Sequence, residues 1–209
     1  MNINLEFDEG EQTFPLDFGE VQFVDDGGYD AGYENGYTEG VASVPDYLEQ
    51  KITGTLTEYT NDKVTSIGRY AFYGSTIKKV NFPAAITSDD GWCHACNSLT
   101  EVNVPKLETV AQYSFFQGYS LLFLDLPSAK SIAHNAFARC TKLETVILRA
   151  NTICTLSNTN ALTNTPIASG TGYIYVPKAL IESYKTATNW SAYAAQFRAI
   201  EDYPEITGG

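Results

Sequence analysis

The sequence predicts a β-rich solenoid in which short parallel strands of successive coils stack on one another. Three apolar columns carry this prediction, because each recurs every 22 residues between residues 64 and 150, and such a fixed period is typical of repeat architectures. Two of the columns lie two positions apart, so their side chains point to one face of a strand. In three of the four units a proline follows and ends the hydrogen-bonded ladder. The columns are Ile77, Leu99, Leu121 and Leu143; Val80, Val102, Leu124 and Val146; and Phe82, Val104, Leu126 and Leu148.

Residues 1–50 are expected to form an acidic arm in front of the solenoid. They hold 13 Asp or Glu and no Lys or Arg, whereas residues 51–209 hold 12 acidic and 13 basic residues. Loose alternation in residues 3–24 predicts two or three short strands. An arm of this charge repels nucleic acid and anionic lipid, so neither is an expected partner. The N-terminus resembles no signal peptide, and no apolar run is long enough for membrane insertion.

A Gly/Tyr-rich segment ends this arm. Its tyrosines and glycines recur every four residues, which would place both along one side of a helix that a second chain could approach closely. Three glycines inside a helix cost about 3 kcal/mol together. The segment is therefore interpreted either as an attachment or oligomerisation element that orders on assembly, or as a flexible spacer. The residues concerned are Tyr29, Gly32, Tyr33, Gly36, Tyr37 and Gly40.

Residues 51–177 are assigned to the solenoid, with about five coils. Residues 52–60 are expected to form a strand that covers the first coil. A second apolar cluster precedes each strand and is predicted to fill the opposite wall. One coil departs from this pattern, offering Ile86 and then Trp92 or Cys93, and is expected to bulge. The clusters pair Ile67 with Phe72, Val110 with Phe115, and Ile132 with Phe137, and a column of small buried residues is expected at Gly74, Cys96, Gly118 and Cys140.

The C-terminal part departs from the 22-residue period. The strand motif at residues 174–176 follows the one at residues 146–148 by 28 positions, which implies a six-residue insertion around residues 158–172. Residues 178–209 are expected to form a helical cap, because apolar residues recur there at approximately helical spacing. These residues are Leu180, Ile181, Tyr184, Trp190, Tyr193 and Phe197.

The repeat units carry a family resemblance. AFYGSTIKKVNFP, ACNSLTEVNVP and AFARCTKLETVIL resemble the BspA-like (Treponema-type) leucine-rich repeat over roughly residues 60–150. The segment from Thr165 to Phe197 is similar to the terminal unit that closes such arrays in gut bacterial proteins. This resemblance implies a leucine-rich-repeat solenoid that acts in surface interaction and adhesion, with neither catalysis nor a cofactor.

The N-terminal arm resembles segments of phage and prophage tail-associated proteins of gut Firmicutes. This second resemblance implies a tail-tip or baseplate protein of the virion, made in the host cytoplasm, whose arm contacts other tail proteins. Its solenoid would bind a protein or glycan of the bacterial surface. Two alternatives stay open: a bacterial adhesin or interaction protein at the cell surface or secreted, and a purely structural tail component. A homo-oligomer, such as a trimer, is expected because tail tips are commonly cyclic assemblies.

The predicted ligand-binding site is the exposed face of the strands, which lines the concave side of a solenoid. Leu122, Phe123 and Ile147 are apolar on this face, so either a ligand or a neighbouring segment or second subunit is expected to cover them. Three rows make up the face: Lys78, Thr100, Leu122 and Glu144; Lys79, Glu101, Phe123 and Thr145; and Asn81, Asn103, Asp125 and Ile147.

A Cys-x-x-Cys pair, Cys93 and Cys96, is the one stretch that suggests metal or redox chemistry. The repeat register places both cysteines inside the coil, and no second Cys/His pair completes a tetrahedral site. Structural packing is the preferred interpretation, because buried thiols are usually inert. His94 and His134 lie in no recognisable catalytic motif, so we expect neither an enzyme nor a metal site.

Overall fold

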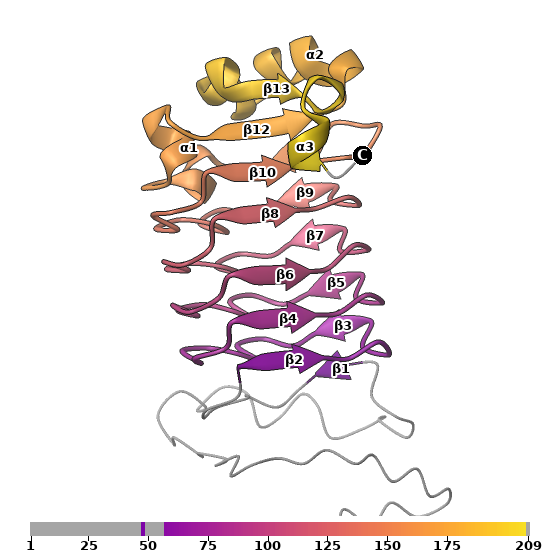
Figure 1. Ribbon diagram of the computed structural model, residues 1–209, viewed down its shortest axis with the longest axis vertical. Helices are drawn as coiled ribbons and strands as arrows, with labels where there is room; N and C mark the ends of the chain where they lie inside the picture. The colour runs from indigo at the N-terminus through magenta and orange to yellow at the C-terminus, as the bar shows by residue number, and fades with distance from the viewer. Residues whose placement is uncertain (1–46, 49–56, 208–209) are drawn as a thin grey trace, which may run out of the picture.

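The computed structural model describes residues 47–48 and 57–207, which form a stack of coils closed by a C-terminal cap (Figure 1). Each coil contributes one strand to a front wall and one shorter strand to a back wall, and all strand pairs are parallel. This confirms the predicted solenoid of parallel strands. The front wall contains β2 (Glu58–Thr60), β4 (Lys79–Asn81), β6 (Glu101–Asn103), β8 (Phe123–Asp125), β10 (Thr145–Ile147), β12 (Tyr173–Val176) and β13 (Phe197–Ala199). The back wall contains β1 (Tyr47–Leu48), β3 (Ser66–Ile67), β5 (Thr87–Ser88), β7 (Thr109–Val110), β9 (Ser131–Ile132) and β11 (Thr155–Leu156).

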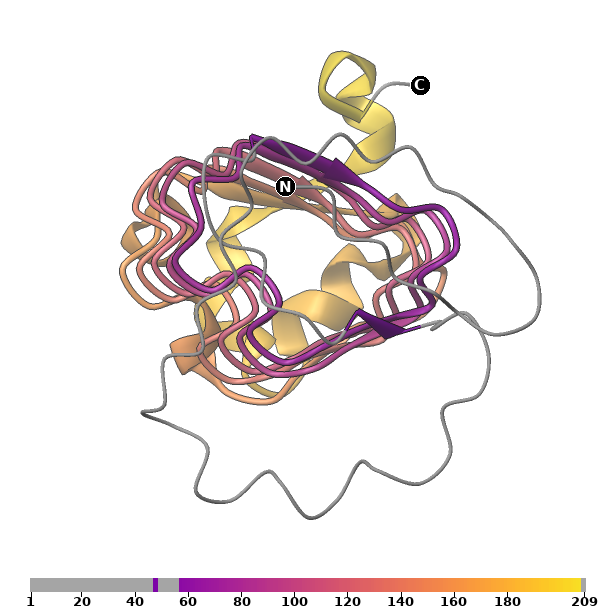
Figure 2. The same cartoon turned by 90° about the horizontal axis from the view of Figure 1, so that it is seen from below.

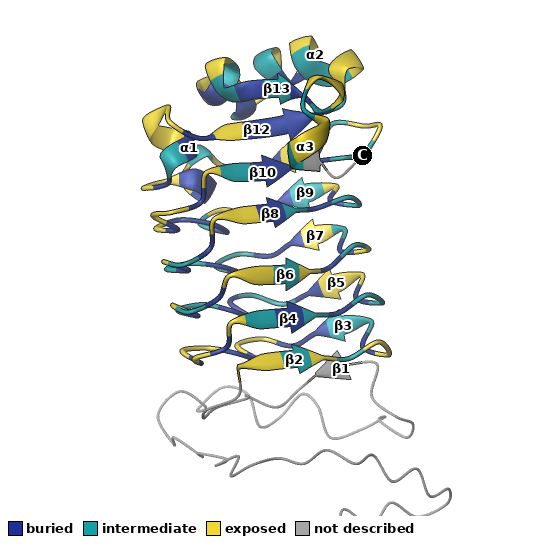
Figure 3. Ribbon diagram, viewed as in Figure 1, coloured by how far each residue is buried: buried dark blue, intermediate teal, exposed yellow. Residues whose placement is uncertain are grey.

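The interior between the two walls holds the predicted apolar columns. Viewed along the stack, the coils superimpose, so equivalent side chains of successive coils meet (Figure 2). All members of the three front-wall columns are buried except Val102, which is half-buried (Figure 3). The back-wall clusters are confirmed too, since Ile67, Val110 and Ile132 are buried beside the phenylalanines that follow them.

Two register predictions for the first coils are wrong, because the back-wall interval from β3 to β5 is one residue shorter than 22. Ser66 pairs with Thr87, 21 positions later, which puts Ser88 opposite Ile67 and leaves Ile86 outside, 43% exposed. The same shift moves the small column from Gly74 to Ser75. In that column each backbone N–H donates to the carbonyl three positions earlier, at Ser75, Cys96, Gly118, Cys140 and Thr165. Gly74 is instead exposed, with φ of 67°.

The coil at Trp92 exchanges a large and a small residue. Backbone hydrogen bonds align Trp92 with the alanine and Cys93 with the phenylalanine of the neighbouring Ala-Phe or Ser-Phe pairs. The indole ring reaches into the space that the missing phenylalanine leaves, with its centroid 6.3 Å from that of Phe72 and 5.0 Å from that of Phe115. The coil therefore keeps its aromatic filling without the expected bulge.

A third ladder of backbone hydrogen bonds joins the coils along the turns that lead into the front strands, here called the turn edge (residues 69–74, 90–95, 112–117, 134–139 and 159–164). Three N–H groups in each of the first two turns, and two in each of the next two, donate to the following turn. In one pair of coils, for example, Cys93 donates to Ser114 and Ala95 to Phe116, at 3.0 and 2.8 Å. Each of the first four turns contains two residues with positive φ, and the fifth contains one, Asn164. These turns give the solenoid a third side, which the sequence pattern does not reveal.

The strand ladders divide between the third and fourth coils, counted from the N-terminal end of the stack. On the front wall β2, β4 and β6 form one hydrogen-bonded sheet and β8, β10, β12 and β13 another, and the back wall divides likewise between β5 and β7. The turn-edge ladder continues across this division. We call this level of the stack the seam.

The C-terminal part widens and then closes the stack. Val146 pairs with Ile174, which confirms the 28-residue spacing, and the inserted residues form the 3-10 helix η1 (Thr159–Leu162) and α1 (Pro166–Ser169). The expected helical cap is interrupted: η2 (Lys178–Leu180), α2 (Ile181–Thr186) and η3 (Trp190–Gln196) are followed by the strand β13, so Phe197 extends the front wall. The chain continues through η4 (Ile200–Asp202) into α3 (Pro204–Thr207), which lies outside the front wall in both views (Figures 1 and 2).

Aromatic side chains tie this cap to the last coil. The Trp190 indole N–H donates to the Cys154 carbonyl at 2.6 Å, and the Tyr184 hydroxyl accepts the Cys154 N–H at 2.8 Å. Tyr193 donates to the Thr159 carbonyl at 2.7 Å. Because the cap covers the apolar end of the solenoid and satisfies its backbone groups, it acts as the terminal cover that a repeat array requires.

The acidic arm lies almost wholly outside the described residues. Its one described element, β1 at residues 47–48, pairs with β3 and so belongs to the back wall. The expected strands in residues 3–24 and the Gly/Tyr segment from Tyr29 to Gly40 are outside the described part of the chain. Among the helices that are described, none combines the length and the apolar character that a membrane crossing requires.

Candidate binding surfaces

The predicted site residues come together on the outside of the front wall. Strand register places Lys79 beside Glu101 and Asn81 beside Asn103 in the lower sheet. In the upper sheet Phe123 lies beside Thr145, and Thr145 beside Tyr173. Lys78, Thr100, Leu122 and Glu144 form an exposed row at the entrance to the strands. Apart from Ile147, the residues of the three predicted rows therefore lie along one surface.

Most polar groups of this surface are paired with their neighbours. Lys79 Nζ lies 3.0 Å from Glu101 Oε2, and the hydrogen bond between them raises the pKa of Lys79. The Asn103 amide donates to the Asn81 amide oxygen at 2.6 Å. Asp125 accepts hydrogen bonds from Nε and a terminal nitrogen of Arg149 at 2.8–3.0 Å, a fork geometry that fixes both side chains. These groups therefore bond mainly to each other and leave few hydrogen-bonding positions for a ligand.

The apolar residues of the surface behave in two ways. Leu122 is 51% exposed and Phe123 is 40% exposed, at the first strand above the seam. Ile147, which was expected to share their exposure, is fully buried. Its strand neighbour Tyr175 packs against Tyr203 with ring centroids 5.4 Å apart, so the chain's own C-terminal segment covers this end of the wall. Leu122 and Phe123 remain as an apolar patch.

The cysteines lie inside the coils. Cys93 and Cys96 are free and fully buried, and burial raises the pKa of the Cys93 thiol. The Cys96 thiol donates to the Phe72 carbonyl at 3.0 Å, and the Cys140 thiol to the Phe115 carbonyl at 2.9 Å. Both thiols thus hold a coil to its neighbour by hydrogen bonding. Within the described residues, no group of three or more Cys, His, Asp or Glu side chains gathers in a way that could hold a metal ion.

The comparison with protein families agrees with this arrangement. The model of the BspA type leucine-rich repeat region matches residues 53–144 and 109–171, with 6 copies. The chain belongs to the BspA-type leucine-rich repeat family. No curated protein matches the chain. The match covers the turn edge and the strands from β2 to β11 and starts after the acidic arm, so it gives no support to the expected resemblance of the arm to phage tail proteins.

The BspA-type repeats also build an aromatic column along the turn edge that the sequence reasoning missed. Tyr73, His94 and Phe116 occupy equivalent turn positions, and the His94 ring lies 4.9 Å from each of the other two, centroid to centroid. Burial lowers the pKa of His94, and its Nδ1 has no hydrogen-bond partner in the structure. Tyr113 stacks on His94 at 5.9 Å. The 21- and 22-residue intervals between these rings were the available signal.

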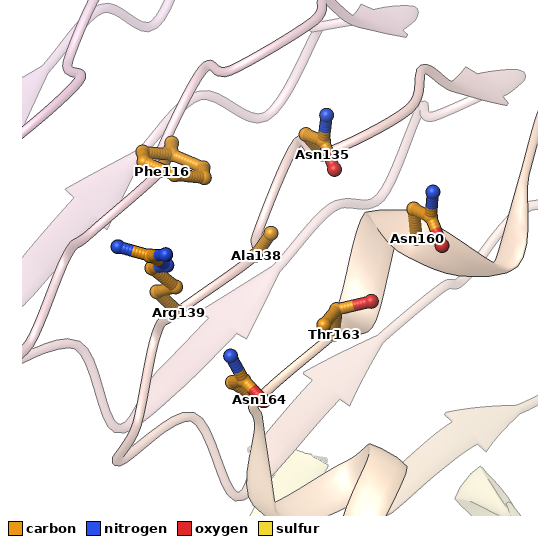
Figure 4. A pocket seen from close by; sticks show the side chains of 7 residues that line it. All are labelled: Phe116, Asn135, Ala138, Arg139, Asn160, Thr163 and Asn164. Carbon is orange, nitrogen blue, oxygen red and sulfur yellow. The ribbon is translucent and has the colours of Figure 1, made fainter.

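The aromatic column ends at a pocket. The next equivalent positions are Ala138 and Thr163, so no ring follows Phe116. The resulting hollow has a volume of about 290 Å³ and lies between the turn at residues 134–139 and η1 (Figure 4). Arg139 places its guanidinium carbon 5.6 Å from the centroid of the Phe116 ring. The BspA-type solenoid therefore presents two candidate surfaces, an apolar patch on the front wall and a polar pocket on the turn edge.

Proposed function

We propose that the protein is a non-enzymatic recognition module that binds a protein at a cell surface through the front wall. The observation that carries this proposal is the exposure of Leu122 and Phe123 on a wall where Lys79 and Glu101, and Asn81 and Asn103, are already bonded to each other. When a partner covers adjacent apolar side chains that were exposed to water, the free energy of the system falls. Membership of the BspA-type family, whose repeats suggest interaction or adhesion, supports the same reading.

The chemistry of the patch favours a protein partner over a glycan. Leu122 offers an aliphatic side chain, and the charged neighbours Lys79 and Glu101 already satisfy each other. Aromatic and aliphatic anchors surrounded by polar residues are the usual centre of a protein interface. In the same row, exposed Glu144 lies next to Leu122 and exposed Lys78 lies two coils away on the other side, and these charges would orient a partner of mixed charge.

Membership of the family favours a bacterial adhesin at the cell surface. A phage tail-tip protein is the second candidate. The tail interpretation depends on the acidic arm, including the Gly/Tyr segment from Tyr29 to Gly40, as the attachment to a particle. Self-association through the front wall, in a trimer or another homo-oligomer, is the competing explanation of the patch.

The test compares two purified double variants for binding to intact cells and for oligomeric state. Leu122→Ser with Phe123→Ser removes the patch, whereas Ile86→Ser with Tyr119→Ser removes side chains of similar exposure, 43% and 38%, away from the front wall. We expect the patch variant to lose at least about tenfold in cell binding, since each interface anchor contributes about 1–2 kcal/mol or more. The control variant should bind like the wild type.

Equal binding by both variants would overturn the proposal. So would a wild-type oligomer that the patch variant converts to a monomer in sedimentation velocity, because the patch would then be a contact between copies of the chain. Deletion of residues 1–46 separates the two locations. An adhesin keeps its cell binding without the arm, and a tail component loses its incorporation into particles.

A further inference from the structure

The turn-edge pocket is the place where one aromatic ring of a regular column is missing. Ring centroids in the column Tyr73, His94 and Phe116 follow one another at 4.9 Å, close to the ~4.8 Å distance between neighbouring strands. Ala138 takes the next position and contributes only a methyl group. Its side chain forms the floor of the hollow, with Phe116 on one side and Thr163 on the other (Figure 4). The pocket thus has room for one ring-sized group against Phe116.

The rim of the pocket is rich in hydrogen-bonding groups that are not used inside the protein. Asn135, Asn160, Thr163 and Asn164 surround the floor, and within residues 57–207 their side-chain amides and hydroxyl make no hydrogen bond to another side chain. Amides both donate and accept, and the hydroxyl does the same. A ligand with several hydroxyl groups could therefore be bound without breaking any internal contact.

Arg139 is the only charged residue that lines the pocket. Its side chain is exposed, contacts the Phe116 ring, and forms no ion pair within the described part of the chain. A guanidinium group binds a carboxylate through two parallel hydrogen bonds. The local charge of the pocket is therefore positive, although the whole chain carries a net charge of -12.

We propose that this pocket binds one pyranose ring of a surface glycan, and binds it most tightly when the sugar carries a carboxylate. The apolar face of the ring would stack on Phe116 and continue the aromatic column, while its hydroxyls bond to the asparagines and Thr163. A carboxylate would bond to Arg139. The volume of about 290 Å³ is at the lower end of ligand pockets, roughly 300–1,000 Å³, as a single sugar residue requires. The site is on a different side of the solenoid from the front-wall patch.

The test uses saturation-transfer NMR on the full chain with methyl β-glucoside and methyl β-glucuronide as probes. p-Cresol serves as the probe for the aromatic side chain of a peptide. We expect both sugars to bind the wild type with dissociation constants on the order of 1 mM, as few contacts allow, and the glucuronide to bind more tightly. Leu122→Ser with Phe123→Ser should leave these values unchanged, which separates this site from the front-wall function.

Three variants locate the binding. Ala138→Phe fills the pocket with the missing ring and should abolish binding of both sugars. Arg139→Gln should weaken binding of the glucuronide about tenfold, to the affinity of the glucoside. Gln117 already occupies the equivalent turn position with φ of 63°, so the substitution fits the backbone. Thr163→Val keeps the shape of the side chain and should weaken binding of both sugars. If Ala138→Phe does not fold, this variant tests whether the sugars bind in the pocket.

Any of three results would overturn the proposal. These are the absence of saturation transfer from both sugars to the wild type, binding that survives both Ala138→Phe and Thr163→Val, and binding of p-cresol alone. Equal affinity for the two sugars in the wild type would refute the role of Arg139 in recognising a carboxylate.

Discussion

The exchange at Trp92 and Cys93 leads to a quantitative prediction. In the neighbouring coils a small residue precedes phenylalanine, whereas this coil places the large residue first and lets the indole fill the same interior space. Restoring the common order with Trp92→Ala and Cys93→Phe should therefore largely refill that space. Each single substitution should be far more harmful than the pair.

The magnitudes follow from burial. Trp92 is fully buried, so Trp92→Ala alone should lower the free energy of unfolding by about 3–5 kcal/mol. Cys93→Phe alone adds a ring to a filled interior and should cost about 1–3 kcal/mol. In the double variant the new ring occupies the vacated space, and the indole N–H, which is buried without a partner in the structure, is gone. Removing such an orphaned donor recovers about 1–3 kcal/mol.

The double variant should thus lie within about 2 kcal/mol of the wild type, with a favourable coupling energy of at least about 2 kcal/mol between the two substitutions. Guanidinium unfolding followed by circular dichroism measures all four proteins of this cycle. Additive effects, within about 0.5 kcal/mol, would refute the idea that the two side chains share one space. Ser114→Ala, at the equivalent position of the next coil, serves as a control for the loss of a hydroxyl that bonds only to a nearby carbonyl.

Two further predictions concern single side chains. Burial lowers the pKa of His94 in the folded protein. Below the ordinary histidine pKa of about 6.5, the unfolded chain therefore binds the proton more readily than the folded protein, and stability falls as the pH decreases. The His94→Phe variant should show a smaller drop in melting temperature between pH 8 and pH 5 than the wild type, and an equal drop would contradict this role of His94. Tyr184→Phe leaves the buried Cys154 N–H without its acceptor and should cost about 1–3 kcal/mol, whereas Tyr119→Phe at an exposed site should change stability by less than about 0.5 kcal/mol in the same denaturation experiment.

The repeat period made the walls predictable from the sequence, because every coil repeats the same inward-facing residues. Leu99, Leu121 and Leu143 could be assigned without knowing any contact. The errors occur where one coil changes length. The interval of 21 positions between Ser66 and Thr87 moved Ile86 outside, and a count of 22 could not detect this. Phe197 fitted a helical spacing as well as a strand, and the parallel edge of β12 decides between them.

The candidate sites were predictable to different degrees. Exposure of Leu122 and Phe123 follows from their positions in the repeat, but the cover over Ile147 depends on a C-terminal segment more than 50 residues away in the sequence. The turn-edge pocket requires two facts at once, the loss of a ring at Ala138 and the longer coil that brings Thr163 opposite it. Neither position is unusual when the sequence is considered alone.

The seam has a consequence for how the solenoid opens. Both strand ladders divide at this level, so the backbone connection between the lower and upper coils depends mainly on the turn-edge ladder, with one back-wall bond from the Glu108 N–H to the Ile86 carbonyl. Ring contacts of Trp92 with Phe115 and of His94 with Tyr113 and Phe116 also cross the seam. Repeat arrays separate at their weakest interface, and local opening has a lower free energy than global unfolding. Amide protons of β4 and β6 should therefore exchange with solvent as one group, ahead of those of β8, β10 and β12. The protein would unfold as two cooperative blocks, with Leu122 and Phe123 at the boundary between them. A partner bound there would stabilise this boundary against opening.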